Sequence, residues 1–185
     1  MIDDTLLTAE EKMAKALEVA KEDFATIRTG RANPAMFTKV AVDYYGTPTP
    51  LQQLASFSTP EPRTILIAPF DMGAMAAIER AIRDSDLGVN PSNDGKLIRV
   101  VLPHLTEERR RDYVKLAKHK AEEARISVRG ARRTAKEALD KMVKDSEVGK
   151  DEVVRAEKQL DASTKKHTDA IDEVLKHKEA ELLEV

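Results

Sequence analysis

The chain contains no cysteine, and this absence excludes several kinds of chemistry. Disulfide bonds, thiolate nucleophiles and cysteine-ligated metal ions are all ruled out. The composition suits a reducing compartment, and the cytoplasm is the expected location. The N-terminus also lacks an apolar stretch long enough for a secretory signal or a membrane span, because Met1–Asp4 leads directly into a charged, periodic segment. We therefore expect no membrane partner.

Tryptophan is absent and aromatic residues make up only 4% of the chain, whereas charged residues make up 35%. The core must therefore be mostly aliphatic, which favours helices packed along narrow apolar stripes. The aromatic residues of the middle segment, Tyr44, Phe57 and Phe70, are expected in the core of a small domain. We do not expect them to form stacking platforms for single-stranded nucleic acid.

Proline is absent from both ends of the chain, since all eight prolines fall between residues 34 and 103. Because proline breaks helix interiors, the ends can form long helices while the middle is restricted to short elements. We therefore predict an α+β protein with two domains. Residues 1–30 and 106–185 form a long antiparallel three-helix bundle, and residues 31–105 form a small inserted β/α/β domain. The chain crosses between the domains twice, which predicts a two-strand hinge.

Hydrophobic periodicity predicts helices in both ends of the chain. The first end places apolar residues at intervals of seven, with Leu17 and Phe24 on the same face: Leu6, Met13, Ala20 and Ile27. In residues 106–144, small apolar residues follow alternating steps of three and four, the seam of a coiled coil: Val114, Ala117, Ala121, Ala124, Val128, Ala131, Ala135, Ala138 and Met142. The alanines in this seam favour close approach of the helices.

Local signals mark the limits of the second and third helices. Thr106 can cap a helix that runs to Lys144, a rod about 58 Å long at roughly 1.5 Å per residue. Residues 146–150 indicate a turn. A third apolar series predicts a helix that runs to the C-terminus: Val153, Leu160, Ile171, Val174, Leu175 and Leu182. Three helices with one apolar seam each are typical of an antiparallel bundle.

The middle segment combines strand and turn signals. Its apolar or alternating stretches predict strands at residues 40–44, 65–68 and 97–102. Turns are expected at residues 46–50 and 91–95, where proline and glycine cluster. Asp71 is expected to cap a short helix that ends near Arg83.

Sequence signatures of catalysis are missing. The histidines show no metal-ligand spacing: His104, His119, His167 and His177. The chain also has no glycine-rich phosphate loop and no nucleophile elbow. His167 lies on the apolar side of the third predicted helix, where a packed or partly exposed imidazole is expected. We therefore predict no catalytic residue, metal site or cofactor.

The net charge of −2 conceals segments of opposite sign. Residues 106–144 carry 13 basic and 7 acidic side chains, a net charge of +6, whereas residues 145–185 carry 7 and 12. Within the basic segment, a second stripe follows the apolar seam displaced by one residue, and all but one of its members are basic: Arg111, Lys115, Lys118, Glu122, Arg125, Arg129, Arg132 and Lys136. One residue corresponds to a rotation of about 100°, so most of these charged groups are expected to reach water.

A row of guanidinium groups on a rigid helix suits the phosphate backbone of nucleic acid. We therefore interpret the stripe, with Arg133 beside it, as an RNA-binding face that recognises backbone and shape. Two other functions stay open at this point. One is a protein–protein scaffold whose cations only keep the bundle soluble, and the other is a hydrolase, which no motif supports.

Over essentially its full length, the chain resembles bacterial ribosome recycling factors. The resemblance rests on segments in this order: RTGRANP at residues 28–34, YYGTPTPL at 44–51, SDLGVNP at 85–91, LTEERR at 105–110 and VRGARR at 128–133. It implies a monomeric translation factor that acts with elongation factor G and GTP after termination. Such a factor splits the ribosomal subunits and releases mRNA and tRNA without a catalytic site of its own.

The stripe and the resemblance together give the expected functional residues. Contacts with large-subunit ribosomal RNA are expected for Arg125, Arg129, Arg132, Arg133, Lys136, Arg110, Arg28 and Arg31. By the same resemblance the hinge is expected at Gly30, Arg31, Pro103, His104 and Leu105. Gly130 departs from the family pattern, which often has asparagine there. Glycine inside a helix costs about 1 kcal/mol relative to alanine, so the helix is expected to be softer beside Arg129.

Overall fold

A computed structural model describes residues 1–184. Packing divides the chain into two compact units, and each is described by itself. The helical unit comprises Met1–Phe24 and Val114–Ala180. The sheet unit comprises Ala25–Tyr113 and the chain from Glu181 on. Long helices thus occur together with a small β-sheet unit, which confirms the predicted α+β class.

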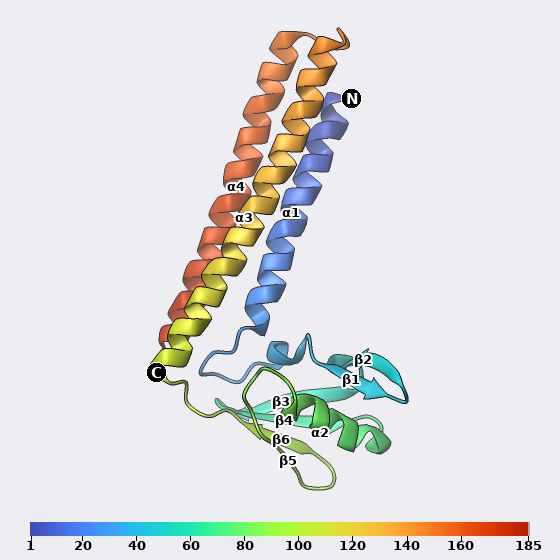
Figure 1. Cartoon of the computed structure of the whole chain (residues 1–185), viewed down its shortest axis with the longest axis vertical. Helices are drawn as coiled ribbons and strands as arrows, with labels where there is room; N and C mark the ends of the chain where they lie inside the picture. Colours follow the sequence, from blue (N-terminus) through green and yellow to red (C-terminus); the bar gives the residue numbers. More distant parts are fainter. Residues whose placement is uncertain (185) are drawn as a thin grey trace. The chain divides into compact units, whose positions relative to one another are not determined.

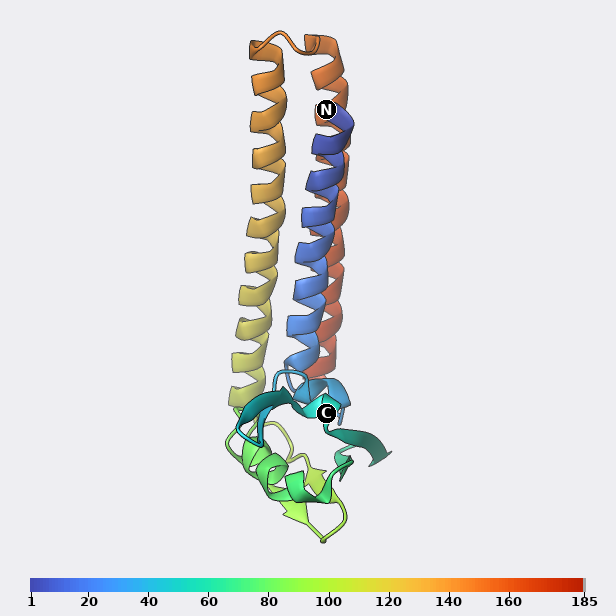
Figure 2. The same ribbon diagram turned by 90° about the vertical axis from the view of Figure 1, so that its right-hand side faces the viewer.

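The helical unit is built from α1 (Ile2–Thr26), α3 (Glu107–Lys144) and α4 (Lys150–Leu183). The helices lie side by side in both views, and α3 runs antiparallel to the other two (Figures 1 and 2). Since these segments contain no proline, their backbone hydrogen bonds continue without interruption over many turns. The predicted antiparallel bundle is confirmed.

Capping residues fix both ends of α3. At its start, the Thr106 hydroxyl accepts a hydrogen bond from the Arg109 amide at 3.1 Å, so the predicted N-cap is confirmed. At its end, Ser146 adopts a left-handed conformation with φ 59°. The Glu147 amide then donates to the Met142 carbonyl at 2.9 Å, the bond of a Schellman motif. The turn predicted around residue 146 is therefore a helix C-cap.

The apolar seam of α3 is the buried face of that helix. Its central members are buried, and Leu139, which the periodicity did not include, joins them: Ala117, Ala121, Ala124, Val128, Ala131 and Ala135. From α1, Met13, Ala20 and Phe24 are buried as predicted. His167 on α4 is also buried, with Nδ1 2.7 Å from the Ser163 carbonyl oxygen. The histidine is therefore packed in the core.

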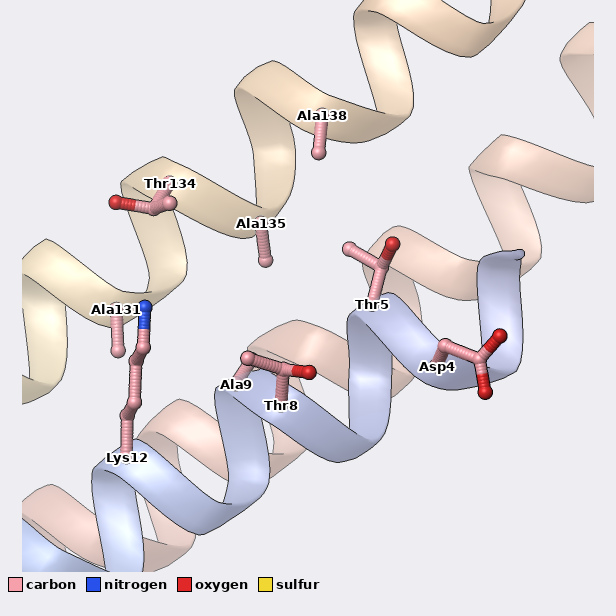
Figure 3. Close-up of a pocket in the computed structure, with 9 residues that line it drawn as sticks. All are labelled: Asp4, Thr5, Thr8, Ala9, Lys12, Ala131, Thr134, Ala135 and Ala138. Carbon is pink, nitrogen blue, oxygen red and sulfur yellow. The ribbon is translucent and has the colours of Figure 1, made fainter.

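The alanines do not close the space between α1 and α3 completely. A groove of about 230 Å³ runs between these helices, with Ala9 on one side and Ala131 and Ala135 on the other (Figure 3). A second groove, of about 310 Å³, lies between Ala16 and Ala124 on the same pair of helices. Small side chains on both helices leave this volume unfilled.

The sheet unit contains a four-stranded antiparallel sheet in the order β3-β4-β6-β5. The strand limits are Ala55–Glu61 (β3), Thr64–Pro69 (β4), Pro91–Asn93 (β5) and Ile98–Val101 (β6). A separate two-stranded sheet pairs β1 (Ala41–Tyr44) with β2 (Thr47–Pro50). Short 3₁₀ turns connect these elements at Pro34–Phe37 (η1), Leu51–Gln53 (η2) and Met72–Ala74 (η3).

The short helix α2 (Met75–Arg83) completes the sheet unit and lies against β1 and β5. Asp71 caps η3, which leads into α2, through a 2.8 Å hydrogen bond from the Gly73 amide. The predicted helix end at Arg83 is confirmed, whereas the predicted cap acts on η3, and α2 begins after Ala74 without a side-chain cap. Ile78 and Ile82 of α2 are fully buried in an aliphatic core with other fully buried residues: Phe37, Val42, Leu51, Ile65, Ile67, Ile98, Val100 and Leu102.

Three local predictions for the sheet unit are wrong. Most of the turn expected at residues 46–50 is strand β2, because its prolines lie on the edge of a two-stranded sheet where their missing N–H groups cost little. Residues 91–93, expected as part of a turn, pair with β6. Phe70, expected in the core, is 71% exposed, whereas Phe57 stacks on Phe37 with ring centroids 5.8 Å apart.

Gly130 lies inside α3, and a β-carbon added there would meet no atom within 4 Å. Replacing Gly130 with alanine should therefore raise the free energy of unfolding by roughly 0.5–1 kcal/mol through helix propensity alone. Chemical denaturation followed by circular dichroism at 222 nm checks this. An unchanged or lower stability would show that the backbone at residue 130 departs from regular helix.

Candidate nucleic-acid interface

The basic stripe of α3 borders the buried seam, and its cations differ in how freely they can move. Arg111, Lys115, Lys118, Arg129 and Lys136 are exposed. Arg125 and Arg132 are only partly exposed, because they face α4. The predicted accessibility therefore holds for most of the stripe and fails for Arg125.

Arg125 is held most firmly. Its side chain is 20% exposed, and its Nη2 and Nε donate to Asp172 Oδ1 of α4 at 2.6 and 2.8 Å. Nη1 also lies 3.1 Å from Glu122 Oε2. Burial alone lowers the pKa of Arg125, but the hydrogen bonds that it donates to Asp172 and Glu122 more than offset this and leave the pKa raised. Arg125 is thus a charged group already satisfied by two carboxylates.

Arg129 and Arg132 are paired more loosely. Arg132 Nε donates to Asp161 Oδ1 of α4 at 2.8 Å, and the two side chains are 38% and 58% exposed. Arg129 Nη1 lies 3.3 Å from Glu122 Oε1, and both side chains are about half exposed. Ion pairs open to water contribute only about 0.2–1 kcal/mol. A phosphate, which can accept bidentate hydrogen bonds from arginine, can therefore displace these carboxylates.

Arg133 and Lys136 are the unpaired cations beside this stretch of α3. Both are exposed, and within residues 1–184 neither forms a hydrogen bond or ion pair. Arg133 and Arg132 are neighbours in sequence, yet one helical step turns Arg133 away from the acids of α4. This stretch of α3 therefore presents four cations to a polyanion: Arg129, Arg132, Arg133 and Lys136.

Arg28 occupies a different environment from the one expected of an RNA contact. The residue is buried in the sheet unit, and its Nη2 donates to the carbonyl oxygen of Pro103. The pKa of this guanidinium is lowered. Burial is the main cause, Arg109 adds to it, and Tyr113 partly opposes it. The resulting link spans 75 positions of the sequence and joins two segments of the sheet unit. We therefore do not retain Arg28 among the candidate RNA contacts.

Four of the five expected hinge residues line one cavity within the sheet unit. A volume of about 580 Å³ is lined by Gly30, Arg31, His104 and Leu105, and Arg110 also lines it. Arg31 Nε lies 3.5 Å from Glu184 Oε2, and both side chains are largely exposed. Arg110 has a buried Nε without a hydrogen-bond partner in the described chain. Arg31 is thus the accessible cation of this group, and Arg110 is partly enclosed.

Neither a metal-binding cluster nor a membrane-spanning helix occurs in the part of the chain that the structure describes. Residues 1–184 contain no group of three or more histidine, aspartate or glutamate side chains placed to hold a metal ion. In the same residues, no helix combines the length and the apolar character that a membrane span requires.

The sequence alone does not reveal which carboxylates compete with phosphate for the arginines of the stripe. Asp161 and Asp172 lie on α4, 29 and 47 positions away from the arginines they contact. Only the antiparallel packing of α3 and α4 brings them together. Glu122 could have been recognised, because it precedes Arg125 by three residues and Arg129 by seven on the same helix face.

Comparison with known proteins points in one direction. Residues 20–183 match the family model described as ribosome recycling factor. Ribosome-recycling factors of Kineococcus radiotolerans and Streptomyces coelicolor are 71% and 66% identical, and each alignment covers the whole of both chains.

Solved structures show the same fold. A solution structure of the ribosome recycling factor is similar with a TM-score of 0.80 at 41% identity, covering 100% of this chain and 98% of the other. A second similar structure is that of the T. thermophilus ribosome recycling factor, together with the E. coli elongation factor G, bound to the E. coli post-termination complex. Its TM-score is 0.71 at 41% identity, with full coverage of both chains.

The substitution Arg28→Ala distinguishes a structural role of Arg28 from a role in RNA binding. Arg28→Ala removes a buried guanidinium and leaves the Pro103 carbonyl without its donor, so the free energy of unfolding should fall by about 2–3 kcal/mol. Arg133→Ala, the matched control at an exposed and unpaired arginine, should change it by less than about 0.5 kcal/mol. Urea titration measures both. Equal stabilities would show that Arg28 is not held by the fold and would restore it as a candidate RNA contact.

Proposed function

The chain belongs to the ribosome recycling factor family, and we propose that it dismantles the post-termination ribosome by binding large-subunit ribosomal RNA through the exposed cations of α3. Elongation factor G and GTP supply the force that splits the subunits and releases mRNA and tRNA. The protein contributes binding energy and leverage and catalyses no bond cleavage. The observation that carries the proposal is the row of exposed, weakly paired or unpaired cations on α3: Arg129, Arg132, Arg133 and Lys136.

The sequence prediction of two domains supplies the mechanical part of the proposal. Residues 1–30 and 106–185 act as the anchored arm, and residues 31–105 act as the domain that moves. We place the hinge at Gly30 and Arg31 on one strand and at Pro103, His104 and Leu105 on the other. Arg31 and Arg110 add contacts to RNA near this end. The chain acts as a monomer, so leverage is applied within a single molecule.

The rigid anchor follows from the packing of α3. A helix of 38 residues with one buried face keeps its outer face straight over many turns. Phosphates spaced along an RNA backbone can then be met by several cations without ordering a flexible segment, which lowers the entropic cost of binding. Arg125 takes part indirectly, because it ties α3 to α4 through Asp172.

A protein–protein scaffold is the alternative class of function, and the ionic-strength dependence of ribosome binding separates the two. Six phosphate contacts, four from α3 and two from Arg31 and Arg110, predict that affinity falls roughly a thousandfold between about 50 and 200 mM monovalent salt, because each contact releases counterions. Arg133→Glu should weaken binding at low salt and reduce the dependence on salt. Filter binding or sedimentation with purified ribosomes measures both.

The control for this charge reversal is Lys158→Glu, at an exposed lysine of α4 that forms no ion pair within residues 1–184. It changes the net charge equally but should leave the affinity and its salt dependence unchanged. A flat salt response of the parent chain, or equal effects of the two substitutions, would contradict anchoring by α3 and favour the scaffold.

The competition between Asp161 and phosphate for Arg132 gives a second test. Asp161→Asn removes the competing carboxylate, so ribosome affinity should rise about two- to fivefold, the equivalent of an exposed ion pair. Asp169→Asn removes the same charge from α4, but Asp169 pairs with Lys165 of its own helix and should have little effect. A loss of affinity in Asp161→Asn would mean that the carboxylate positions Arg132 for binding.

A further inference from the structure

The outer face of α3 carries an isoleucine and a glycine between exposed arginines. Steps of three or four residues connect the members of this face: Ile126, Arg129, Gly130 and Arg133. Ile126 and Gly130 lie two residues on either side of the buried Val128, a rotation of about 200°, so both point away from the seam. We call Ile126, together with the open space above Gly130, the notch.

Gly130 opens the helix surface down to the backbone. A β-carbon built there would meet no side chain of the described residues within 4 Å, apart from those of its two chain neighbours. The helix continues through this position, and the Thr134 hydroxyl donates to the Gly130 carbonyl at 3.1 Å. A partner can therefore approach the axis of a rigid helix more closely at Gly130 than at a residue with a side chain.

The same glycine leaves Ile126 uncovered. In an α-helix a side chain leans toward the N-terminus, onto the residue four positions before it. The side chain that would cover Ile126 is therefore the one missing at position 130, and Ile126 is 60% exposed. Neither residue stabilises the free chain, because the isoleucine buries little apolar area and the glycine weakens the helix. Together they place apolar surface on a face that is otherwise charged.

Two cations flank the notch. Arg133 forms no hydrogen bond or ion pair within residues 1–184, and Arg129 is only loosely paired with Glu122. The two arginines are four residues apart, which is about 6 Å along the helix axis. Toward the end of α3 the next acid on this face is Glu137, about 10 Å along the axis from Gly130. The notch is thus an uncharged unit between two positive charges.

The spacing of charged and apolar groups matches the repeat of a nucleic-acid backbone, in which an uncharged sugar lies between two phosphates. Arginine binds phosphate with bidentate hydrogen bonds, and the carbon atoms of a sugar can pack on an aliphatic side chain. A stacked base fits less well, because stacking requires an aromatic ring and the sequence of α3 contains none after Tyr113. The chemistry therefore favours a sugar over a base.

We propose that the notch receives a sugar of the RNA backbone while Arg129 and Arg133 bind the phosphates on either side of it. The sugar packs on Ile126, and the missing side chain at Gly130 lets the strand lie close enough for both phosphates to reach the arginines. Ile126 and Gly130 are thus positioning residues, which fix a strand that ionic contacts alone would allow to slide. The proposal rests on the proposed function, because it takes RNA as the partner of α3, and it adds a contact that is not ionic.

Filling the notch separates binding from folding. Gly130→Leu places a good helix former in open space, so the free energy of unfolding in a urea titration should rise. The added side chain keeps the strand away from the helix, so ribosome affinity measured by sedimentation should fall at least about tenfold. Gln159→Leu adds the same side chain at an exposed neutral residue of α4, and this control should bind like the parent chain.

Ile126→Ser removes the apolar contact without changing any charge. Ribosome affinity should fall about three- to tenfold, in proportion to the apolar area that the sugar covers. The dependence of affinity on salt should match that of the parent chain, because the number of released counterions stays the same. Arg133→Glu should reduce that dependence, so the apolar and ionic contributions are measured separately.

Hydroxyl-radical footprinting of ribosomal RNA identifies the group in the notch, because these radicals cleave at the sugar. With saturating protein, both Gly130→Leu and Ile126→Ser should lose protection at the same one or two successive sugars and keep the rest of the parental footprint. Parental affinity in both variants would overturn the proposal. Lower affinity with an unchanged footprint would also overturn it and would indicate a protein at the notch. A flat salt response of the parent chain would instead contradict the anchor itself, so the two failures are distinguishable.

Discussion

The buried alanine and valine seam of α3 is the constraint on which the other features of the helical unit depend. Because one face of this helix is fixed against its neighbours, every other side chain on it has a defined direction. A step of one residue from the seam places an arginine at the border with α4, and a further step places it in water. Arg132 and Arg133 show the result, since one meets Asp161 and the other meets no partner in the described chain.

Acidic residues of α3 and α4 bind the arginines of the stripe with different strengths. Arg125, the least exposed, is bound by two carboxylates and serves the bundle. Arg129 and Arg132 are bound by one each, in pairs weak enough to be exchanged for phosphate. In the proposed function these acids hold the guanidinium groups extended while the protein is free. They also reduce the local positive potential, which limits binding to unrelated polyanions.

The sheet unit combines a closed core with individual side chains that are strained or exposed. Its aliphatic core is closed by α2 and the strands, and Arg28 connects distant segments through the Pro103 carbonyl. Against this stable background, Tyr45 adopts a left-handed conformation and Phe70 leaves the core for the surface. Departures from local preference of this kind are tolerated where the surrounding structure is over-determined.

The sequence alone determined the features that depend on local and periodic signals. These are the α+β class, the long helices, the cap at Thr106, the short helix after Asp71 and the basic character of α3. Each follows from a spacing or a capping residue within a few positions along the chain. The family resemblance could likewise be stated from the sequence, because its segments are contiguous.

Only the tertiary structure decided which charged side chains are buried or paired and where the aromatic rings pack. Arg28 is held by a carbonyl 75 positions away, Arg125 is paired with a carboxylate 47 positions away, and Phe57 stacks on Phe37, 20 positions away. The proline-containing segment 47–50 is a strand because β1 lies beside it. In each case the decisive partner is distant in sequence, and spacing along a single segment carries no information about a partner on another.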